Sequence, residues 1–145
     1  MGRDENFKTL EGEDVVKDAA AVLAEFDDVA VFVLFSVFEA IVRDHVMNEV
    51  IAETAIIKHP ALAKAARSLK GNIEEGSFYN NVLDLYKDVN HDLVEEVNRV
   101  RNYRNWVAHG RRPDKKRPNV SPVTAVDCLR RFLVLIGHRA PHDRG

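Results

Sequence analysis

The side chains of this chain best suited to chemistry are Arg104, Asn105 and His109, in the segment RNWVAHG at residues 104–110. They combine a permanent cation, an amide and the one type of side chain that titrates near neutral pH. Cleaving RNA without a metal requires a base for the 2′-hydroxyl proton, an acid for the leaving 5′-oxygen and a cation for the phosphoryl oxygens. The segment therefore indicates phosphodiester chemistry, with His109 as acid or base, Arg104 stabilising the transition state and Asn105 as an orienting group.

The spacing of these residues favours a site shared between two copies of the chain. Five residues along a regular helix rotate two side chains to about 140° apart, so Arg104 and His109 of one copy diverge. Two such helices meeting across a twofold axis would supply a base and an acid from symmetry-related copies. Asn105 and His109 share a helix face, so the amide could orient the imidazole or a phosphate. The alternative is structural: a helix ending in a cation that favours its dipole, with Arg104 and Asn105 on the solvated side.

In a small, all-helical chain this arrangement resembles the HEPN family, whose motif is an Arg, four to six residues and a His, commonly with Asn, Asp or His directly after the Arg. The resemblance covers most of the chain at the level of the fold and rests on one short motif. It implies an all-α, HEPN-like bundle of about four to six helices, with the motif helix near the C-terminal third. It also implies a homodimer and a metal-independent endoribonuclease that cleaves single-stranded RNA, leaving a cyclic phosphate and a free 5′-hydroxyl.

Family members with this motif act as toxins of toxin–antitoxin systems, in phage defence and in RNA processing, so the resemblance allows each of these roles. It also implies a possible partner, a cognate antitoxin such as a minimal nucleotidyltransferase. Some HEPN toxins carry a Tyr two residues after the motif His, which such an antitoxin can modify, but this chain has Arg111 there. The alternative function is a HEPN-like dimer that binds a nucleotide, RNA or a protein without cleaving it.

Glu39 is a candidate supporting residue because it interrupts the most apolar run of the chain, residues 30–42. A buried carboxylate is costly unless it is paired. Two partners are open: Arg43, one helical turn further on, or the motif helix, where Glu39 would position Arg104 or His109.

The charges of the chain are distributed unevenly, although the net charge is only -2. Residues 99–145 carry 12 Lys/Arg against 3 Asp/Glu, a net charge of +9, which leaves -11 for residues 1–98. A basic segment of this kind attracts RNA through its phosphates, although it can also be a merely solubilising loop. The candidate RNA-binding cations are Arg101, Arg111, Arg112, Lys115, Lys116 and Arg117.

Composition predicts one domain over residues 1–145, with flexible ends at 1–12 and 138–145. Cys128 is the only cysteine, so we expect a packed thiol, no intrachain disulfide and a cytoplasmic protein. We expect no metal site and no cofactor, since the histidines lack metal-ligand spacing. The N-terminus does not read as a signal peptide, and no apolar run is long enough to cross a membrane. Tyr103 and Trp106, beside the motif, are candidates for stacking on a base, with packing favoured for Trp106.

The elements that must position these residues are helices, because apolar residues recur at helical spacing and no strand pattern is present. Asp27 and Asp28 indicate a boundary between two helices, and His59-Pro60 ends the second of them. Gly110 is expected to close the motif helix, and Ser121-Pro122 to begin the last one. The expected helices span residues 13–26, 29–58, 60–69, 78–87, about 90–110 and 122–136, with Gly71 and a loop at 72–77 after the third.

Overall fold

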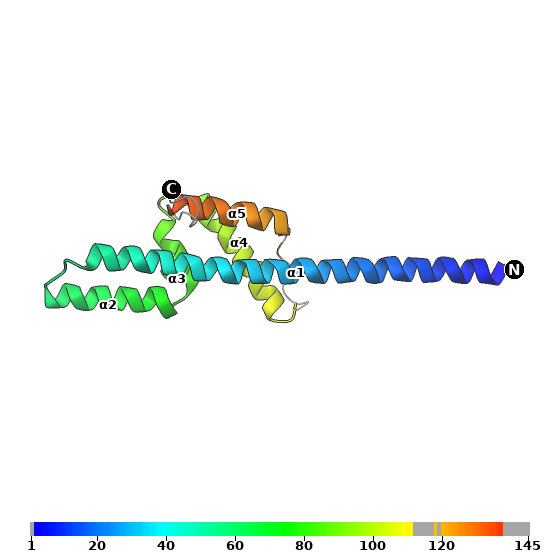
Figure 1. Ribbon diagram of the computed structural model, residues 1–145, viewed down its shortest axis with the longest axis horizontal. Helices are drawn as coiled ribbons and strands as arrows, with labels where there is room; N and C mark the ends of the chain where they lie inside the picture. Colours follow the sequence, from blue (N-terminus) through cyan, green and yellow to red (C-terminus); the bar gives the residue numbers. More distant parts are fainter. Residues whose placement is uncertain (1, 112–117, 119, 138–145) are drawn as a thin grey trace, which may run out of the picture.

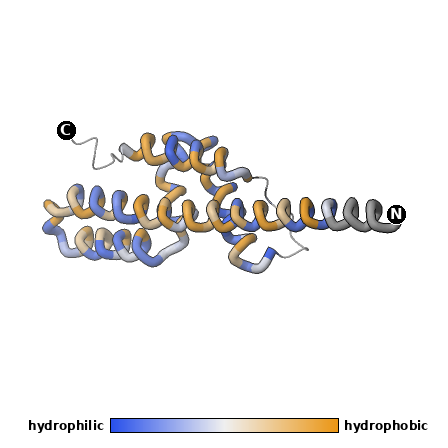
Figure 2. Tube along the Cα trace, turned by 45° about the vertical axis from the view of Figure 1, so that its right-hand side comes forward, coloured by the Kyte–Doolittle hydropathy of each residue, from blue (hydrophilic) through white to orange (hydrophobic). Residues whose placement is uncertain are grey.

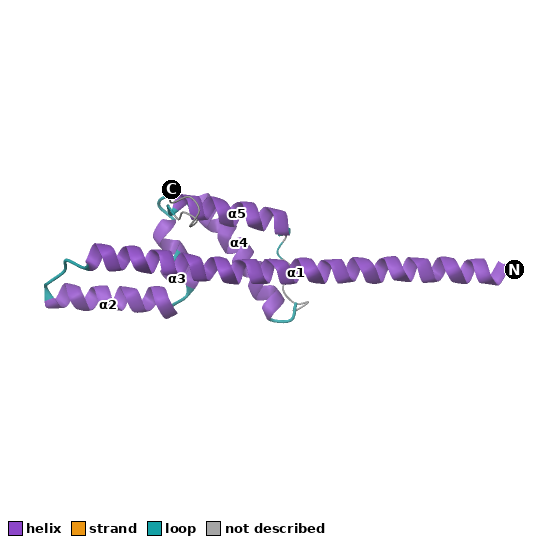
Figure 3. Ribbon diagram, in the orientation of Figure 1, coloured by secondary structure: helices purple, strands orange, loops and turns teal. Residues whose placement is uncertain are grey.

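The fold is a helical bundle built against one very long helix, as the computed structural model in Figure 1 shows. The structure describes residues 2–111, 118 and 120–137, and side chains from residue 12 onward within these ranges. The described residues form helices and no strands (Figure 3), which confirms the all-α class. The helices are α1 (Gly2–Thr54), α2 (Pro60–Glu75), α3 (Phe78–Asn81), the 3₁₀ helix η1 (Leu83–Tyr86), α4 (His91–Ala108) and α5 (Pro122–Leu135).

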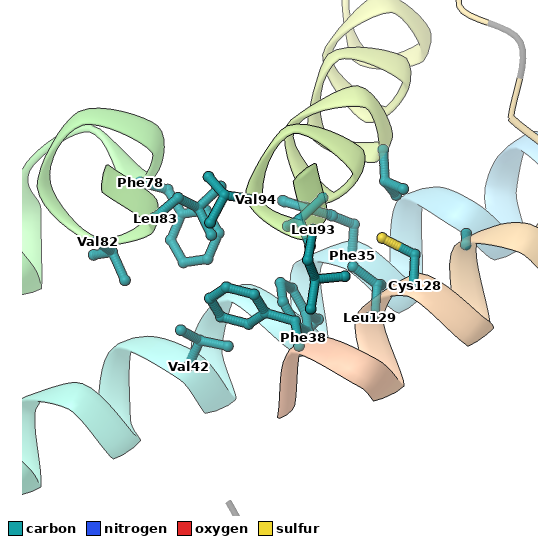
Figure 4. Close-up of a cluster of buried hydrophobic side chains, with 14 of the residues drawn as sticks. Phe35, Phe38, Val42, Phe78, Val82, Leu83, Leu93, Val94, Cys128 and Leu129 are labelled. Carbon is teal, nitrogen blue, oxygen red and sulfur yellow. The ribbon is translucent and has the colours of Figure 1, made fainter. Parts of the chain in front are cut away.

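The core lies where the C-terminal half of α1 meets the other helices. α1 contributes Phe35, Phe38 and Val42, which recur every three to four residues and so share one face. Figure 4 shows Phe38 close to Phe78 of α3, and the two rings meet edge to face with their centroids 6.1 Å apart. The remaining fully or nearly buried residues in this cluster include Val82, Leu83, Leu93, Val94, Val97, Val100, Tyr103, Ala125, Cys128, Leu129 and Phe132.

α1 is continuous, so the predicted boundary at Asp27 and Asp28 is wrong. Asp28 lies at a core position of the same periodicity as Val31 and Phe35, and it is 4% exposed. Its carboxylate accepts a hydrogen bond from the Tyr103 hydroxyl and pairs with Arg111, so it does not need to cap a new helix. Residues 2–12, where a flexible end was predicted, belong to α1, and residues 138–145 lie outside the described part.

α2 runs further than predicted, through Gly71 and up to the C-cap Gly76. A glycine inside a helix costs about 1 kcal/mol relative to alanine, which tertiary contacts readily offset. Here Ile73, in the last turn, is completely buried and its carbonyl accepts a hydrogen bond from Arg43. These contacts hold residues 72–75, where a loop was predicted, in the helix.

Most predicted helix starts are confirmed by their capping bonds. Asn90 Oδ1 accepts the Leu93 N–H, and Ser121 Oγ accepts the Thr124 N–H at the first turn of α5. Ser77 caps α3, but the predicted helix over residues 78–87 divides into α3 and η1. Val82 leaves helical geometry there, at φ -121°, and both it and Leu83 become fully buried.

The described helices include none that combines the length and apolar character needed to cross a membrane.

Candidate functional site

Arg104 is held by three contacts, two of them with α1 and one with its neighbour in α4. One terminal nitrogen donates to Glu39 Oε2 at 3.0 Å, and Nε donates to Asn105 Oδ1 at 3.0 Å. The guanidinium carbon lies 4.8 Å from the centroid of the Phe35 ring. The side chain is 18% exposed, so it is fixed but still reachable from solvent. Only two of the five N–H donors of an arginine are used in these two bonds, which leaves donors for a phosphate.

Glu39 joins Arg104 to Arg43, so both partners considered from the sequence are present. Its Oε1 accepts from Arg43 at 3.0 Å while Oε2 accepts from Arg104. Arg43 also donates to the carbonyls of Ile73 at 2.7 Å and Gly76 at 2.9 Å. Glu39 thus positions Arg104 on the motif helix. Through Arg43, the same carboxylate also connects that helix to the C-terminal end of α2.

Arg101 lies beside Arg104 and has no carboxylate within ion-pair distance among the described residues. Its Nε donates to Asn98 Oδ1 at 2.9 Å, and its guanidinium carbon is 5.5 Å from the centroid of the Tyr79 ring. Burial and the neighbouring charge of Arg104 lower the pKa of Arg101 from its ordinary value. An arginine stays protonated in proteins despite such a shift, so the charge is present, and the Glu39 carboxylate acts on it only through space. This arrangement suits an incoming anion.

His109 is the C-cap of α4 and is exposed. The chain leaves the helix through Gly110, whose φ is +79°, as predicted for the residue that closes this helix. The N–H of Gly110 donates to the Val107 carbonyl, and the N–H of Arg111 donates to the Trp106 carbonyl. This double closure is a Schellman motif, which fixes the backbone on both sides of the imidazole.

Arg111 anchors this turn to α1 and has a φ of 56°. Its terminal nitrogens pair with Glu25 at 2.8 Å and with Asp28 at 2.6 Å. The hydrogen bond to Glu25 is the main reason that the pKa of Arg111 is raised. The positive charge is therefore compensated within the chain, and we assign Arg111 a structural role in place of the predicted RNA contact. Asp28 also accepts from Tyr103, so one buried carboxylate holds both α4 and the turn after His109.

The structure brings together some of the predicted site residues and separates others. Arg104, Asn105, Glu39 and Arg101 lie around one region between α1 and α4. His109 is at the end of α4, and no hydrogen bond or ion pair of the described residues joins its imidazole to Arg104 or Asn105. Asn105 holds Arg104 rather than the imidazole, which differs from one of its two predicted roles. The predicted RNA-binding residues Arg112, Lys115, Lys116 and Arg117 lie outside the described residues.

Sequence reasoning missed Asp28 as a positioning residue and gave Arg43 only a structural role. Asp28 could have been found from its place in the core periodicity, seven residues before Phe35. Arg43 contacts α2 through backbone carbonyls, and a hydrogen bond to a backbone carbonyl leaves no pattern in the sequence.

The aromatic residues and the cysteine near the motif mainly pack. Tyr103 is 1% exposed, so its ring is not available to stack on a base. Trp106 packs against the core at its partly buried position, with its ring centroid 6.0 Å from that of Tyr103. Cys128 is buried, and burial raises the pKa of its thiol to about 11, which confirms a packed thiol. Within the described part of the chain, no three His, Cys, Asp or Glu side chains are grouped as metal ligands.

Comparison with known protein families, with curated proteins and with solved structures found no match to this chain.

Proposed function

We propose that this chain is a metal-independent endoribonuclease of HEPN type, which cleaves single-stranded RNA at a site composed from two copies of the motif helix. The observation that carries the proposal is that one short segment holds both side chains in reach of solvent. Arg104 is fixed and partly exposed on α4, and His109, five residues further on, is exposed at the C-cap of that helix. A toxin or phage-defence role would follow from the same activity, and the family resemblance is its only support.

The proposed reaction uses the 2′-hydroxyl of the RNA as the nucleophile. His109 of one copy removes the 2′ proton, the oxygen attacks the adjacent phosphorus, and the bond from phosphorus to the 5′-oxygen breaks. His109 of the second copy gives a proton to that leaving oxygen. The products are a 2′,3′-cyclic phosphate and a free 5′-hydroxyl, so no water and no metal enters this step.

The arginines of the site would stabilise the negative charge that grows on the phosphoryl oxygens. Arg104 supplies preorganised donors, because Glu39 and Asn105 already fix its orientation. Arg101, which has no ion-pair partner among the described residues, supplies a second positive charge that draws the phosphate in. The three roles needed for cleavage are thereby assigned to residues of α4 and its C-cap.

The test is cleavage of a labelled single-stranded RNA pool in EDTA by the wild type, Arg104→Ala and His109→Ala. We expect a loss of about 10²–10³-fold for Arg104→Ala and about 10²–10⁴-fold for His109→Ala. Arg130→Ala is the matched control, because Arg130 is exposed on α5 and should leave the rate unchanged. If both motif variants retain the wild-type rate, the proposal is wrong. RNA binding without cleavage by the wild type would instead favour the non-catalytic alternative.

A further inference from the structure

The N-terminal half of α1 extends beyond the bundle as a single helix (Figure 1). Every residue from 12 to 27 is exposed, although this segment is rich in alanine and valine. Figure 2 shows hydrophobic residues recurring along this part of the helix. A soluble helix with a continuous exposed apolar stripe is typical of a surface that is covered in the assembled protein.

The exposed stripe has the spacing of a coiled coil. Its residues are separated by 4, 3, 4, 3 and 4 positions, which is the pattern of successive a and d positions of a heptad. The five larger side chains of the stripe are 53–67% exposed. We name these residues the α1 seam: Val15, Ala19, Val22, Phe26, Val29 and Val33.

The α1 seam lies on the side of α1 opposite to the core. At 100° per residue, Phe26 of the seam and Phe35 of the core are about 180° apart around the helix. The core of the bundle, among the residues that the structure describes, therefore does not block a second helix along the seam. The seam is therefore not the surface that presents Arg104, and a partner bound there would not touch the candidate site.

We infer that the α1 seam binds the α1 seam of a second copy of this chain, as a parallel, two-stranded coiled coil. The heptad pattern makes the surface self-complementary, since each copy offers the same knobs and holes. Residues 15–33 span about 27 Å of helix. With Val16, Leu23 and the other apolar residues at its margin, the contact would bury on the order of 1,000 Å² in total, which is about the minimum expected of a biological interface.

Charge favours the parallel orientation. Residues 12–28 carry six Asp/Glu and one Lys, and the acidic residues Asp18 and Glu25 directly precede the a residues Ala19 and Phe26. In a parallel pair this position faces the residue that follows each d position of the partner helix, which is apolar Leu23 or Ala30. An antiparallel pair would instead bring the acidic margins of the two helices together. The Glu25 carboxylate is also already paired with Arg111.

The test compares the particle mass of full-length variants by sedimentation and light scattering. Val22→Lys combined with Phe26→Lys places charges in the seam, and we expect the wild-type mass to fall by half. Ala20→Lys combined with Ala24→Lys is the matched control, because it adds the same charge to exposed positions of the same segment outside the seam. A monomeric wild type, or an unchanged mass of the seam variant, would overturn the inference. This holds also where the seam instead binds another protein or a membrane surface, because neither would give a dimer of this chain.

Disulfide trapping reads out the orientation separately. Cys128 is buried, so cysteines introduced at exposed positions report on the new sites alone. A parallel seam predicts that Val15→Cys and Val29→Cys each form a disulfide between identical copies on mild oxidation, while Ala24→Cys does not. In an antiparallel pair Val15 would instead lie opposite Val33 of the second copy. A disulfide that forms only when the Val15→Cys and Val33→Cys proteins are mixed would therefore show an antiparallel pair and overturn the parallel seam.

Discussion

At the residue scale, the site depends on how Glu39 holds two arginines. Its two carboxylate oxygens are used separately, one for Arg104 and one for Arg43, and both bonds are 3.0 Å long. Removing the charge while keeping the shape should therefore loosen Arg104 without removing it from the site.

We predict that Glu39→Gln lowers the RNA cleavage rate by about tenfold and destabilises the fold by about 1–2 kcal/mol, because a charge-assisted hydrogen bond is replaced by a weaker neutral one. The measurements are the cleavage rate and urea denaturation. Glu53→Gln, on the exposed surface of the same helix, is the control and should change neither. A full-rate Glu39→Gln enzyme would remove Glu39 from the positioning of Arg104.

Asp28 is the second residue whose environment makes a specific prediction. It is 4% exposed, contacts Tyr103 and Arg111, and precedes the bundle part of α1. Asn at this position keeps the size and an acceptor oxygen but loses the charge that pairs with Arg111.

We expect Asp28→Asn to lower the free energy of unfolding by about 1–3 kcal/mol, because Arg111 would lose a buried ionic partner. Its neighbour Asp27 is exposed, so Asp27→Asn should change stability by less than about 0.5 kcal/mol. Thermal and urea unfolding of the two variants check this contrast. Equal effects of the two substitutions would mean that the buried contacts of Asp28 do not hold the turn after His109.

At the element scale, the end of α2 is packed tightly where Arg43 reaches its last carbonyls. A Cβ added to Gly76 would lie 2.4 Å from the Asn72 carbonyl oxygen and 2.5 Å from the Asn81 side chain. A backbone oxygen cannot move aside as the end of a flexible side chain can. A glycine is therefore required at position 76, because the Asn72 carbonyl lies too close for a Cβ.

We predict that Gly76→Ala costs about 1–3 kcal/mol of stability through this overpacking. Gly71→Ala is the control within the same helix, since its added Cβ meets nothing within 4 Å and alanine favours helix, so it should be neutral or stabilising. Circular dichroism during thermal unfolding distinguishes the two. A Gly76→Ala protein as stable as the wild type would show that the end of α2 can shift freely.

The helix boundaries also show how much of the fold the sequence alone predicts. Asn90, Ser121 and Gly110 were readable, because capping and helix closure depend on residue type at one position. The break predicted at Asp28 and the early end predicted at Gly71 failed for a common reason. Both residues have poor intrinsic helix propensity, and in both places contacts from distant segments decided the outcome.

The candidate site was predictable to a similar degree. Arg104, Asn105 and His109 were found because they share one short motif, and Glu39 because a carboxylate interrupts an apolar run. The bonds that Asn105 makes to Arg104, and that Asp28 makes to Arg111, depend on how α1 and α4 pack. No local pattern reports that packing.

At the scale of the whole molecule, the proposed composite site predicts that activity depends on pairs of copies. If cleavage needs His109 from both members of a pair, a pair with one His109→Ala copy is inactive. Wild-type and His109→Ala chains refolded together in equal amounts should therefore retain about one quarter of the activity of the wild type alone, because random pairing sets the fraction of intact pairs.

The measurement is the cleavage rate across a series of mixing ratios. The rate should follow the square of the wild-type fraction. A rate that falls in direct proportion to that fraction would show that each copy works alone, and would contradict the composite site while leaving the ribonuclease itself in place.

If both proposals hold, the α1 seam is a second twofold surface, on the opposite side of α1 from the core. A chain that used both surfaces would assemble into tetramers or open arrays rather than dimers. The two surfaces can be separated by experiment, because seam variants change particle mass and motif variants change cleavage.

The most direct test of the central claim is the rate at which the wild-type protein cuts a single-stranded RNA in EDTA, beside the same oligonucleotide made of 2′-deoxynucleotides. The predicted result is cleavage of the RNA to cyclic-phosphate and 5′-hydroxyl ends, no cleavage of the deoxy strand, and a loss of about 10²-fold or more in His109→Ala. Cleavage of the deoxy strand at a similar rate, or an RNA cleavage rate unchanged by His109→Ala, would contradict it.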